Sequence, residues 1–135
     1  MPVIHWTSDL SINIAEIDRQ HQQLIRLLND LDEVMRKGRE KDALGKIILS
    51  LIGYTATHFS TEEKLFDRFG YPETVPHQKE HSGFVKKVTS FHREFNEGGL
   101  ELTIPVMNFL MEWLKNHISG SDKRYAPFLN ERGLK

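Results

Sequence analysis

Two histidines, His77 and His81, stand four residues apart in the segment HQKEH. On a helix this spacing places both imidazole rings on one face, where they can bind a metal ion. With Glu80 between them, the segment also matches H-x-x-E-H, a pattern that some zinc proteases use with the glutamate as catalytic base. The segment therefore supports two hypotheses, a zinc protease or a metal site completed by other parts of the chain.

Further histidines and carboxylates occur at spacings that suit metal binding. His58 and Glu62 stand four residues apart in HFSTEE, and His21 lies in IDRQHQQL. A single pair of this kind is more often a solvated helix face than a metal site. The pairs gain meaning only if the fold brings them together.

His117 and Asp122 stand five residues apart in HISGSD. A continuous α-helix would separate two such side chains by about 140°, so Asp122 can share a metal with His117 only if the helix loosens between them. Gly120 and Ser121 lie in this interval, and glycine readily ends a helix. The alternative for Asp122 is a surface position at a helix terminus.

The elements that must position these residues are helices. Apolar residues recur at helical spacing in four segments, which run from Asp18 to Lys37 before Gly38, from the N-cap residue Asp42 to Phe69, from Thr74 to the Gly98–Gly99 pair, and from Thr103 to Gly120. Short links between long helices favour antiparallel neighbours. We therefore expect one all-α domain, an up-down-up-down four-helix bundle (residues 18–122) with an irregular N-terminal arm (residues 1–17) and a C-terminal segment (residues 123–135).

Polar residues interrupt the apolar faces of these helices. Periodicity assigns His58, Glu62, His77, His81 and His117 to the core. One buried histidine is usually a hydrogen-bonded core residue, whereas an unpaired buried carboxylate costs several kcal/mol or takes up a proton. Three helices each place such groups inward, and His21 adds one from the first helix. This joint pattern indicates a metal site.

The candidate ligands are five histidines and two carboxylates, namely His21, His58, Glu62, His77, His81, His117 and Asp122. They exceed what one four-coordinate zinc ion can use and suit two metal ions that share both carboxylates. Imidazole and carboxylate without thiolate admit iron, manganese or zinc.

The segments IDRQHQQL, HFSTEE, HQKEH and HISGSDKRY, in this order, resemble the hemerythrin-like domains, specifically the single-domain bacteriohemerythrins. The resemblance covers nearly the whole chain, including the arm with Trp6. It implies two irons bridged by an oxo or hydroxo group, with Glu62 and Asp122 as bridging carboxylates. By the same resemblance one iron is filled and the other binds O2 reversibly at an open position. The filled iron is held by His77, His81 and His117, and the open iron by His21 and His58.

Composition limits the partners and the location of the chain. Its 135 residues carry a net charge of −1, which does not indicate a nucleic-acid partner. The N-terminus lacks the features of a secretory signal, and the longest apolar run, IILSLIGY, is too short for membrane insertion. Without cysteine there is no thiolate zinc site, which fits the cytoplasm. We expect a monomer or weak oligomer, and the sequence identifies no protein recipient.

Residues beside the candidate ligands receive their own predictions. Phe59 and Trp113 are expected to exclude water from the site, although plain core packing explains them equally well, and Tyr125 to pack over the site or cap the bundle. Helical spacing turns Glu63 about 100° away from Glu62, so Glu63 is predicted to be solvated, and it turns Glu80 away from the inward face. The remaining two histidines, His5 and His92, are predicted to lie at the surface or rim.

The sequence therefore predicts a non-enzymatic O2-binding protein for transport, storage or buffering of oxygen. A protease would leave His21, His58 and His117 unexplained, and no predicted strand offers an edge for a peptide. Two alternatives stay open. One is an iron or oxygen sensor, which at this length would act through a separate partner. The other is a di-iron redox enzyme that handles nitric oxide or peroxide, or repairs iron centres.

Overall fold

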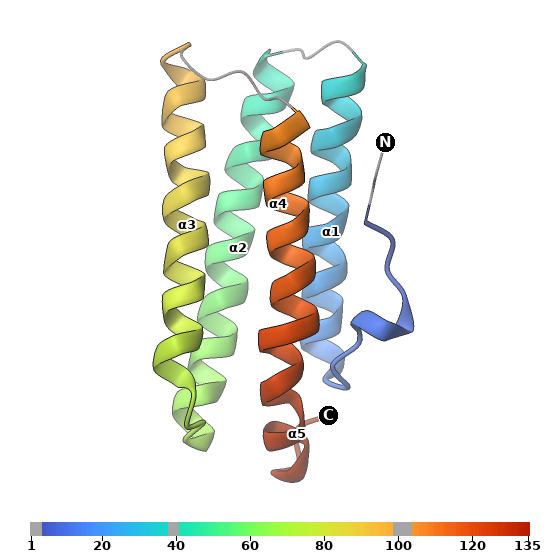
Figure 1. Ribbon diagram of the computed structural model, residues 1–135, viewed down its shortest axis with the longest axis vertical. Coiled ribbons are helices and arrows are strands. Elements are labelled where there is room, and N and C mark those ends of the chain that lie inside the picture. The colour runs from blue at the N-terminus through green and yellow to red at the C-terminus, as the bar shows by residue number, and fades with distance from the viewer. Residues whose placement is uncertain (1–3, 38–40, 99–103) are drawn as a thin grey trace.

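The computed structural model describes residues 4–37, 41–98 and 104–135, and within these ranges it contains helices and no strand. Four long helices alternate in direction and form a bundle (Figure 1). They are α1 (Ala15–Arg36), α2 (Lys41–Phe69), α3 (Thr74–Asn96) and α4 (Ile104–Asn116). A π-helical segment (His117–Asp122) joins α4 to a short helix, α5 (Lys123–Glu131). The predicted all-α four-helix bundle is confirmed.

The first helix begins at Ala15, earlier than the predicted start at Asp18. Asp18 lies in its first turn and accepts hydrogen bonds from the Ile12 backbone N–H (2.9 Å) and the Ser11 hydroxyl (2.5 Å). A carboxylate in the first turn also interacts favourably with the helix dipole. Asp18 therefore fastens the N-terminal arm, which contains a 3-10 turn at Ser8–Leu10, to the start of α1.

The second helix begins at Lys41, so Asp42 belongs to its first turn and the predicted N-cap role is wrong. The predicted boundary residues Gly38, Gly99 and Thr103 lie outside the described residues.

The link between α2 and α3 is a tight turn. Gly70 has a φ of +69°, a conformation that glycine adopts without a steric penalty. The turn is closed by a hydrogen bond from the Tyr71 N–H to the Phe66 carbonyl (3.0 Å). Thr74 then donates its hydroxyl to the Tyr71 carbonyl (2.6 Å) at the start of α3. This short connection places α2 and α3 side by side in opposite directions.

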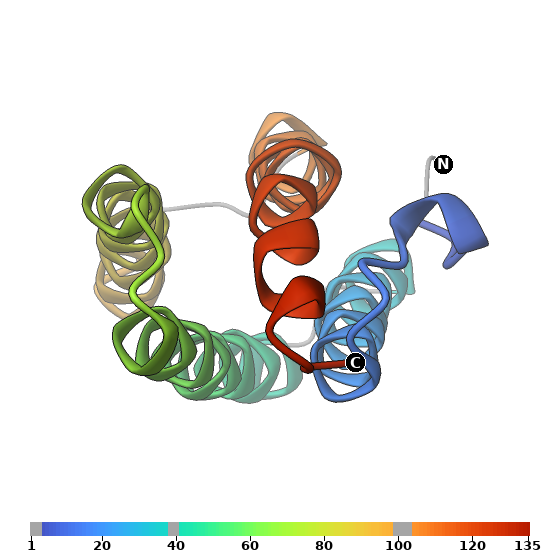
Figure 2. The same cartoon turned by 90° about the horizontal axis from the view of Figure 1, so that it is seen from below.

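Two apolar clusters fill the interior. The larger runs along the four long helices and includes Leu28, Leu51 and Leu110. The smaller lies at one end of the bundle and joins the arm, α1, α2 and α5 through Ile12, Ile14, Ile17, Phe66, Tyr71, Tyr125, Ala126 and Leu129. Figure 2 shows α5 turning from the end of α4 across that end of the bundle towards α1. Among the described residues, no helix is long and apolar enough to cross a membrane.

Candidate metal centre

All seven predicted ligands lie inside the bundle. None is more than 4% exposed, and Glu62, Asp122 and His21 are fully buried. The side chains come from α1 (His21), α2 (His58, Glu62), α3 (His77, His81) and the π-helical segment (His117, Asp122). The structure therefore brings together every residue that the sequence proposed as a ligand.

The side chains form two overlapping groups in which one potential ligand atom per residue lies within 4.8 Å of all the others. The first group, called here the three-histidine position, contains His77, His81 and His117 with both carboxylates. The second, the two-histidine position, contains His21 and His58 with the same carboxylates, Glu62 and Asp122. Two carboxylates shared between two groups are the arrangement that a bridged metal pair requires.

The two oxygens of Asp122 face the two positions. Oδ1 lies 2.9 Å from His77 Nε2 and 3.1 Å from His117 Nε2, whereas Oδ2 lies 3.0 Å from His21 Nε2. Glu62 behaves differently, because a single oxygen, Oε1, lies 3.4 Å from His58 Nε2 and 3.2 Å from His81 Nε2.

Among the residues that the structure describes, several of these atoms have no hydrogen-bond partner although they lie close to one another. They are His21 Nε2, His77 Nε2, Glu62 Oε1 and both carboxylate oxygens of Asp122. The separations are short enough for hydrogen bonds, so the angles must fail, as they do when donors point to a common centre rather than to each other. Each unsatisfied buried group costs about 1–3 kcal/mol, which a cation bound between them would remove. The donor set fits two metal ions with nitrogen and oxygen ligands.

The π-helical segment allows Asp122 to lie beside His117. In a π-helix the hydrogen bonds run from residue i to i+5, so side chains five apart fall on the same side. The predicted loosening between these residues is thus confirmed. The helix does not end there, however, because the chain continues directly into α5.

Burial and neighbouring charges shift the pKa values of the metal-free cluster in different directions. Burial lowers the pKa of His58 and of His81 to about 4. Burial acts in the same direction on His117, but the negative charges of Asp122 and Glu62 and the contacts with Asp122 and Glu80 together outweigh it and raise that pKa to about 9. Burial and the nearby Asp122 raise the pKa of Glu62, whereas the pKa of Asp122 lies well below its usual value because His117, His21 and His77 together outweigh its burial. Neutral imidazole is the form that binds metal.

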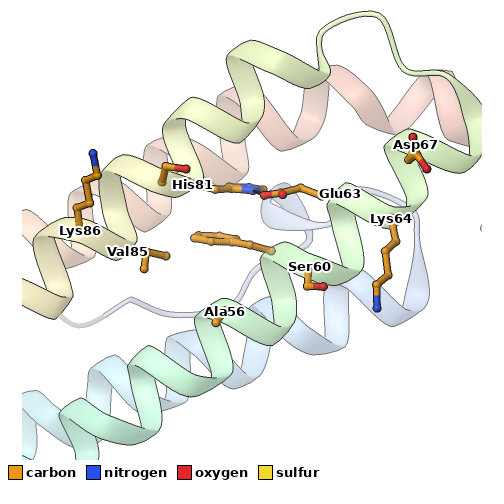
Figure 3. A pocket seen from close by; sticks show the side chains of 10 residues that line it. Ala56, Ser60, Glu63, Lys64, Asp67, His81, Val85 and Lys86 are labelled. Atoms are coloured by element: carbon orange, nitrogen blue, oxygen red, sulfur yellow. Dashed lines mark hydrogen bonds and ion pairs between the residues drawn. The ribbon is translucent and has the colours of Figure 1, made fainter.

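The predictions for Glu63 and Glu80 hold only in part, because both side chains are partly exposed but each carboxylate also contacts a proposed ligand. Glu63 Oε2 lies 2.8 Å from Nδ1 of His81, and Glu80 Oε1 lies 3.0 Å from Nδ1 of His117. Figure 3 shows Glu63 reaching from α2 towards His81 on α3. Helical spacing gives only the direction of Cβ, and a glutamate carboxylate extends far enough to reach a ligand on the neighbouring helix.

The outer ring nitrogens, Nδ1, of two other proposed ligands have different surroundings. His58 Nδ1 lies 2.6 Å from the amide oxygen of Gln20, whereas His21 Nδ1 is buried and has no hydrogen-bond partner within the described part of the chain. Gln20 is not among the predicted site residues. One sequence signal was available, because Gln20, Glu63 and Glu80 each stand next to a predicted ligand in the chain.

Aromatic rings enclose the histidines. Phe59 stacks on His81 with ring centroids 3.7 Å apart, and Trp113 stacks on His117 at 4.5 Å. Phe66 meets His77 edge-on at 4.9 Å. Tyr125 is fully buried and donates its hydroxyl to Glu62 Oε2. The ring of Tyr125 also belongs to the apolar cluster at the end of the bundle, so both predicted placements hold.

The two histidines predicted to lie outside the site do so. His5 is exposed in the N-terminal arm. His92 is partly exposed on α3 and lies 3.3 Å from the Asn96 side chain.

Comparison with known proteins agrees with this geometry. Residues 13–129 match the model of the hemerythrin HHE cation binding domain. A bacteriohemerythrin of Stenotrophomonas maltophilia (strain R551-3) is 36% identical over 93% of this chain and 81% of its own length. One of Methylococcus capsulatus (strain ATCC 33009 / NCIMB 11132 / Bath) is 30% identical over 96% and 99%, respectively.

The fold has solved counterparts as well. The crystal structure of a wild-type hemerythrin superposes with a TM-score of 0.88 at 29% identity, over 93% of this chain and 97% of that one. Family membership implies a non-haem di-iron centre, and the buried cluster of histidines and carboxylates is able to hold metal ions. The chain belongs to the hemerythrin family.

Proposed function

We propose that this protein binds O2 reversibly at a di-iron centre, for the transport, storage or buffering of oxygen. The observation that carries the proposal is the unequal division of ligands. The three-histidine position has five protein side chains and the two-histidine position has four, with Glu62 and Asp122 counted in both. A metal pair held in this way has room for an external ligand on the side of His21 and His58.

In this proposal the seven buried side chains would hold the two irons, and Glu62 and Asp122 would contribute ligands to both. When bound, the iron pair supplies the reversible redox chemistry by which O2 is taken up and released. The orientation of Asp122 supports the bridging role, because its two oxygens face histidines of different positions.

The surroundings of the centre support binding without further reaction. Neutral imidazoles outnumber the carboxylates among the proposed ligands, whereas ferritin-like di-iron sites take most of their ligands from carboxylates. Anionic oxygen ligands favour high-valent iron, so a histidine-rich centre is expected to stop before O2 is cleaved. The rings of Phe59 and Trp113 stack on His81 and His117 and keep water from their faces.

Oxygen uptake by the anaerobically reduced, iron-loaded protein tests the proposal. We expect about one O2 per two irons, with no further consumption when a reductant is present. Removal of oxygen should then return the O2 to the gas phase. Sustained consumption with reductant would indicate a redox enzyme instead. Irreversible oxidation, together with tight iron-dependent binding to a second protein, would indicate a sensor.

A further inference from the structure

Three residues connect neighbouring helices in the same way. Each stands next to a proposed ligand in the sequence, and each lies against the outer nitrogen of a ligand on the following helix. Gln20, before His21 on α1, reaches His58 on α2. The other two contacts run from Glu63 on α2 to His81 on α3, and from Glu80 on α3 to His117 on the π-helical segment.

The charges of these three residues are distributed unequally. Both glutamates contact histidines of the three-histidine position. At the two-histidine position, His58 meets the neutral amide of Gln20, and His21 Nδ1 has no hydrogen-bond partner in residues 4–37, 41–98 and 104–135. All the negative charge in this outer set therefore lies behind one of the two metal positions.

We propose that Glu63 and Glu80 are positioning residues that make the three-histidine position the preferred holder of ferric iron. This inference rests on the proposed function. A histidine that binds metal through Nε2 carries its proton on Nδ1, and a carboxylate that accepts this proton in a hydrogen bond makes the ring a stronger donor. Stronger donation stabilises the higher oxidation state, so the iron held by His81 and His117 is oxidised first.

Both glutamates are held in place. Ser121 donates its hydroxyl to Glu80 Oε1 (2.7 Å) and Oε2 (2.9 Å), which fixes that carboxylate beside His117. Glu63 lies in a groove of about 560 Å³ between α2 and α3, and Figure 3 shows its carboxylate beside the ring of His81. The side chains of Glu63 and Glu80 are 32% and 41% exposed, so water reaches both carboxylates while the histidines stay buried.

Midpoint potentials of the iron-loaded protein, measured optically without oxygen, test the inference. Glu63→Gln and Glu80→Gln keep an oxygen that can accept the Nδ1 hydrogen but remove the charge. We expect each to raise the potential of the first oxidation step. A tenfold loss of preference for ferric over ferrous iron corresponds to about 59 mV.

Two further variants distinguish the effect of the glutamate–histidine contacts from that of negative charge elsewhere near the site. Asp67→Asn removes a negative charge from the same groove, and Figure 3 shows Asp67 pointing away from His81. Asp67→Asn should change the potential by only a small fraction of the Glu63→Gln shift. Gln20→Glu places a carboxylate behind His58. It should lower the potential of the second oxidation step, because the added charge makes His58 a stronger donor.

The outcomes distinguish this inference from the proposed function. Failure of the wild-type protein to hold two irons and bind O2 would overturn the proposed function. If it does both, but Glu63→Gln and Glu80→Gln shift the potentials no more than Asp67→Asn does, the inference is overturned and the proposed function stands.

Discussion

His117 Nε2 lies 3.1 Å from Asp122 Oδ1, although five residues separate the two along the chain. The π-helical segment His117–Asp122 makes this contact, because an α-helix would turn the side chains about 140° apart. The same segment redirects the chain into α5, whose Tyr125 binds the other shared carboxylate, Glu62. The π-helical segment therefore supplies two of the proposed ligands, and it leads into the helix that supports a third.

The π-helical segment does not need a glycine at position 120 to keep its shape. A Cβ added at Gly120 would meet no atom within 4 Å, and its φ is not positive. We expect Gly120→Ala to keep the metal content and to raise the free energy of unfolding by about 0.4–1 kcal/mol, because alanine restricts the unfolded chain. Urea unfolding of the metal-free protein measures the change.

Gly70→Ala is the matched control. Gly70 has a φ of +69°, where alanine costs about 1–2 kcal/mol, so this variant should be less stable. A Gly120→Ala protein destabilised as much as Gly70→Ala would mean that the wide turn depends on glycine after all.

Tyr125 orients Glu62. The hydroxyl of Tyr125 is its donor to Oε2, and both side chains are fully buried. Tyr125→Phe keeps the ring in the end cluster but removes the donor, and we expect metal binding to weaken about 10- to 100-fold. Competition with a chelator measures the affinity. A ring-only role would leave that affinity unchanged.

The two positions should lose metal separately. His58 belongs only to the two-histidine position. We expect His58→Ala to hold about one metal per chain and to lose O2 binding, since the proposed site of O2 is on that side. Metal analysis after desalting measures the content. His92→Ala, which changes a histidine outside the cluster, should keep both metals; equal losses in the two variants would refute the assignment.

The metal-free protein should be most stable near pH 6.5. The pKa values of His58 and His81, about 4, lie below the ordinary 6.5, so the unfolded chain gains two protons as the pH falls from 6.5 towards 4 and stability drops. The pKa of Glu62 is raised, so the folded chain binds this proton more tightly than the unfolded chain does. This offsets the loss of stability by at most one proton. His117, with a pKa of about 9, stabilises fully below pH 6.5 and loses its contribution as the pH rises through 9.

Urea unfolding in the presence of a chelator, near pH 5, pH 6.5 and pH 8.5, measures this profile. A higher midpoint at pH 6.5 than at both other values is expected. A midpoint that changes in one direction across the range would contradict the charge states described for the cluster.

Much of this architecture was predictable from residue spacing. The recurrence of apolar residues identified four helices, and the same periodicity placed His58, Glu62, His77 and His81 inward. Their burial in the structure follows from those faces packing together. Helix boundaries were less accurate, because a residue such as Asp18 can serve the arm from inside the first turn of α1.

Contacts between helices were not predictable in the same way. The angle of Cβ turns Glu63 and Glu80 away from the site, but flexible side chains carry their carboxylates to His81 and His117 on adjacent helices. The spacing of His117 and Asp122 indicated a loosened helix without showing that it would continue as a π-turn. Those features depend on how helices pack, which the periodicity of one segment does not encode.

The most direct test of the central claim combines metal analysis with an optical spectrum. The spectrum is recorded on anaerobically reduced protein, after oxygen is admitted, and again after oxygen is removed. The account predicts two irons per chain and a colour that appears with oxygen and bleaches when oxygen is withdrawn. Zinc or no metal in the protein, or a colour that never bleaches, would contradict it.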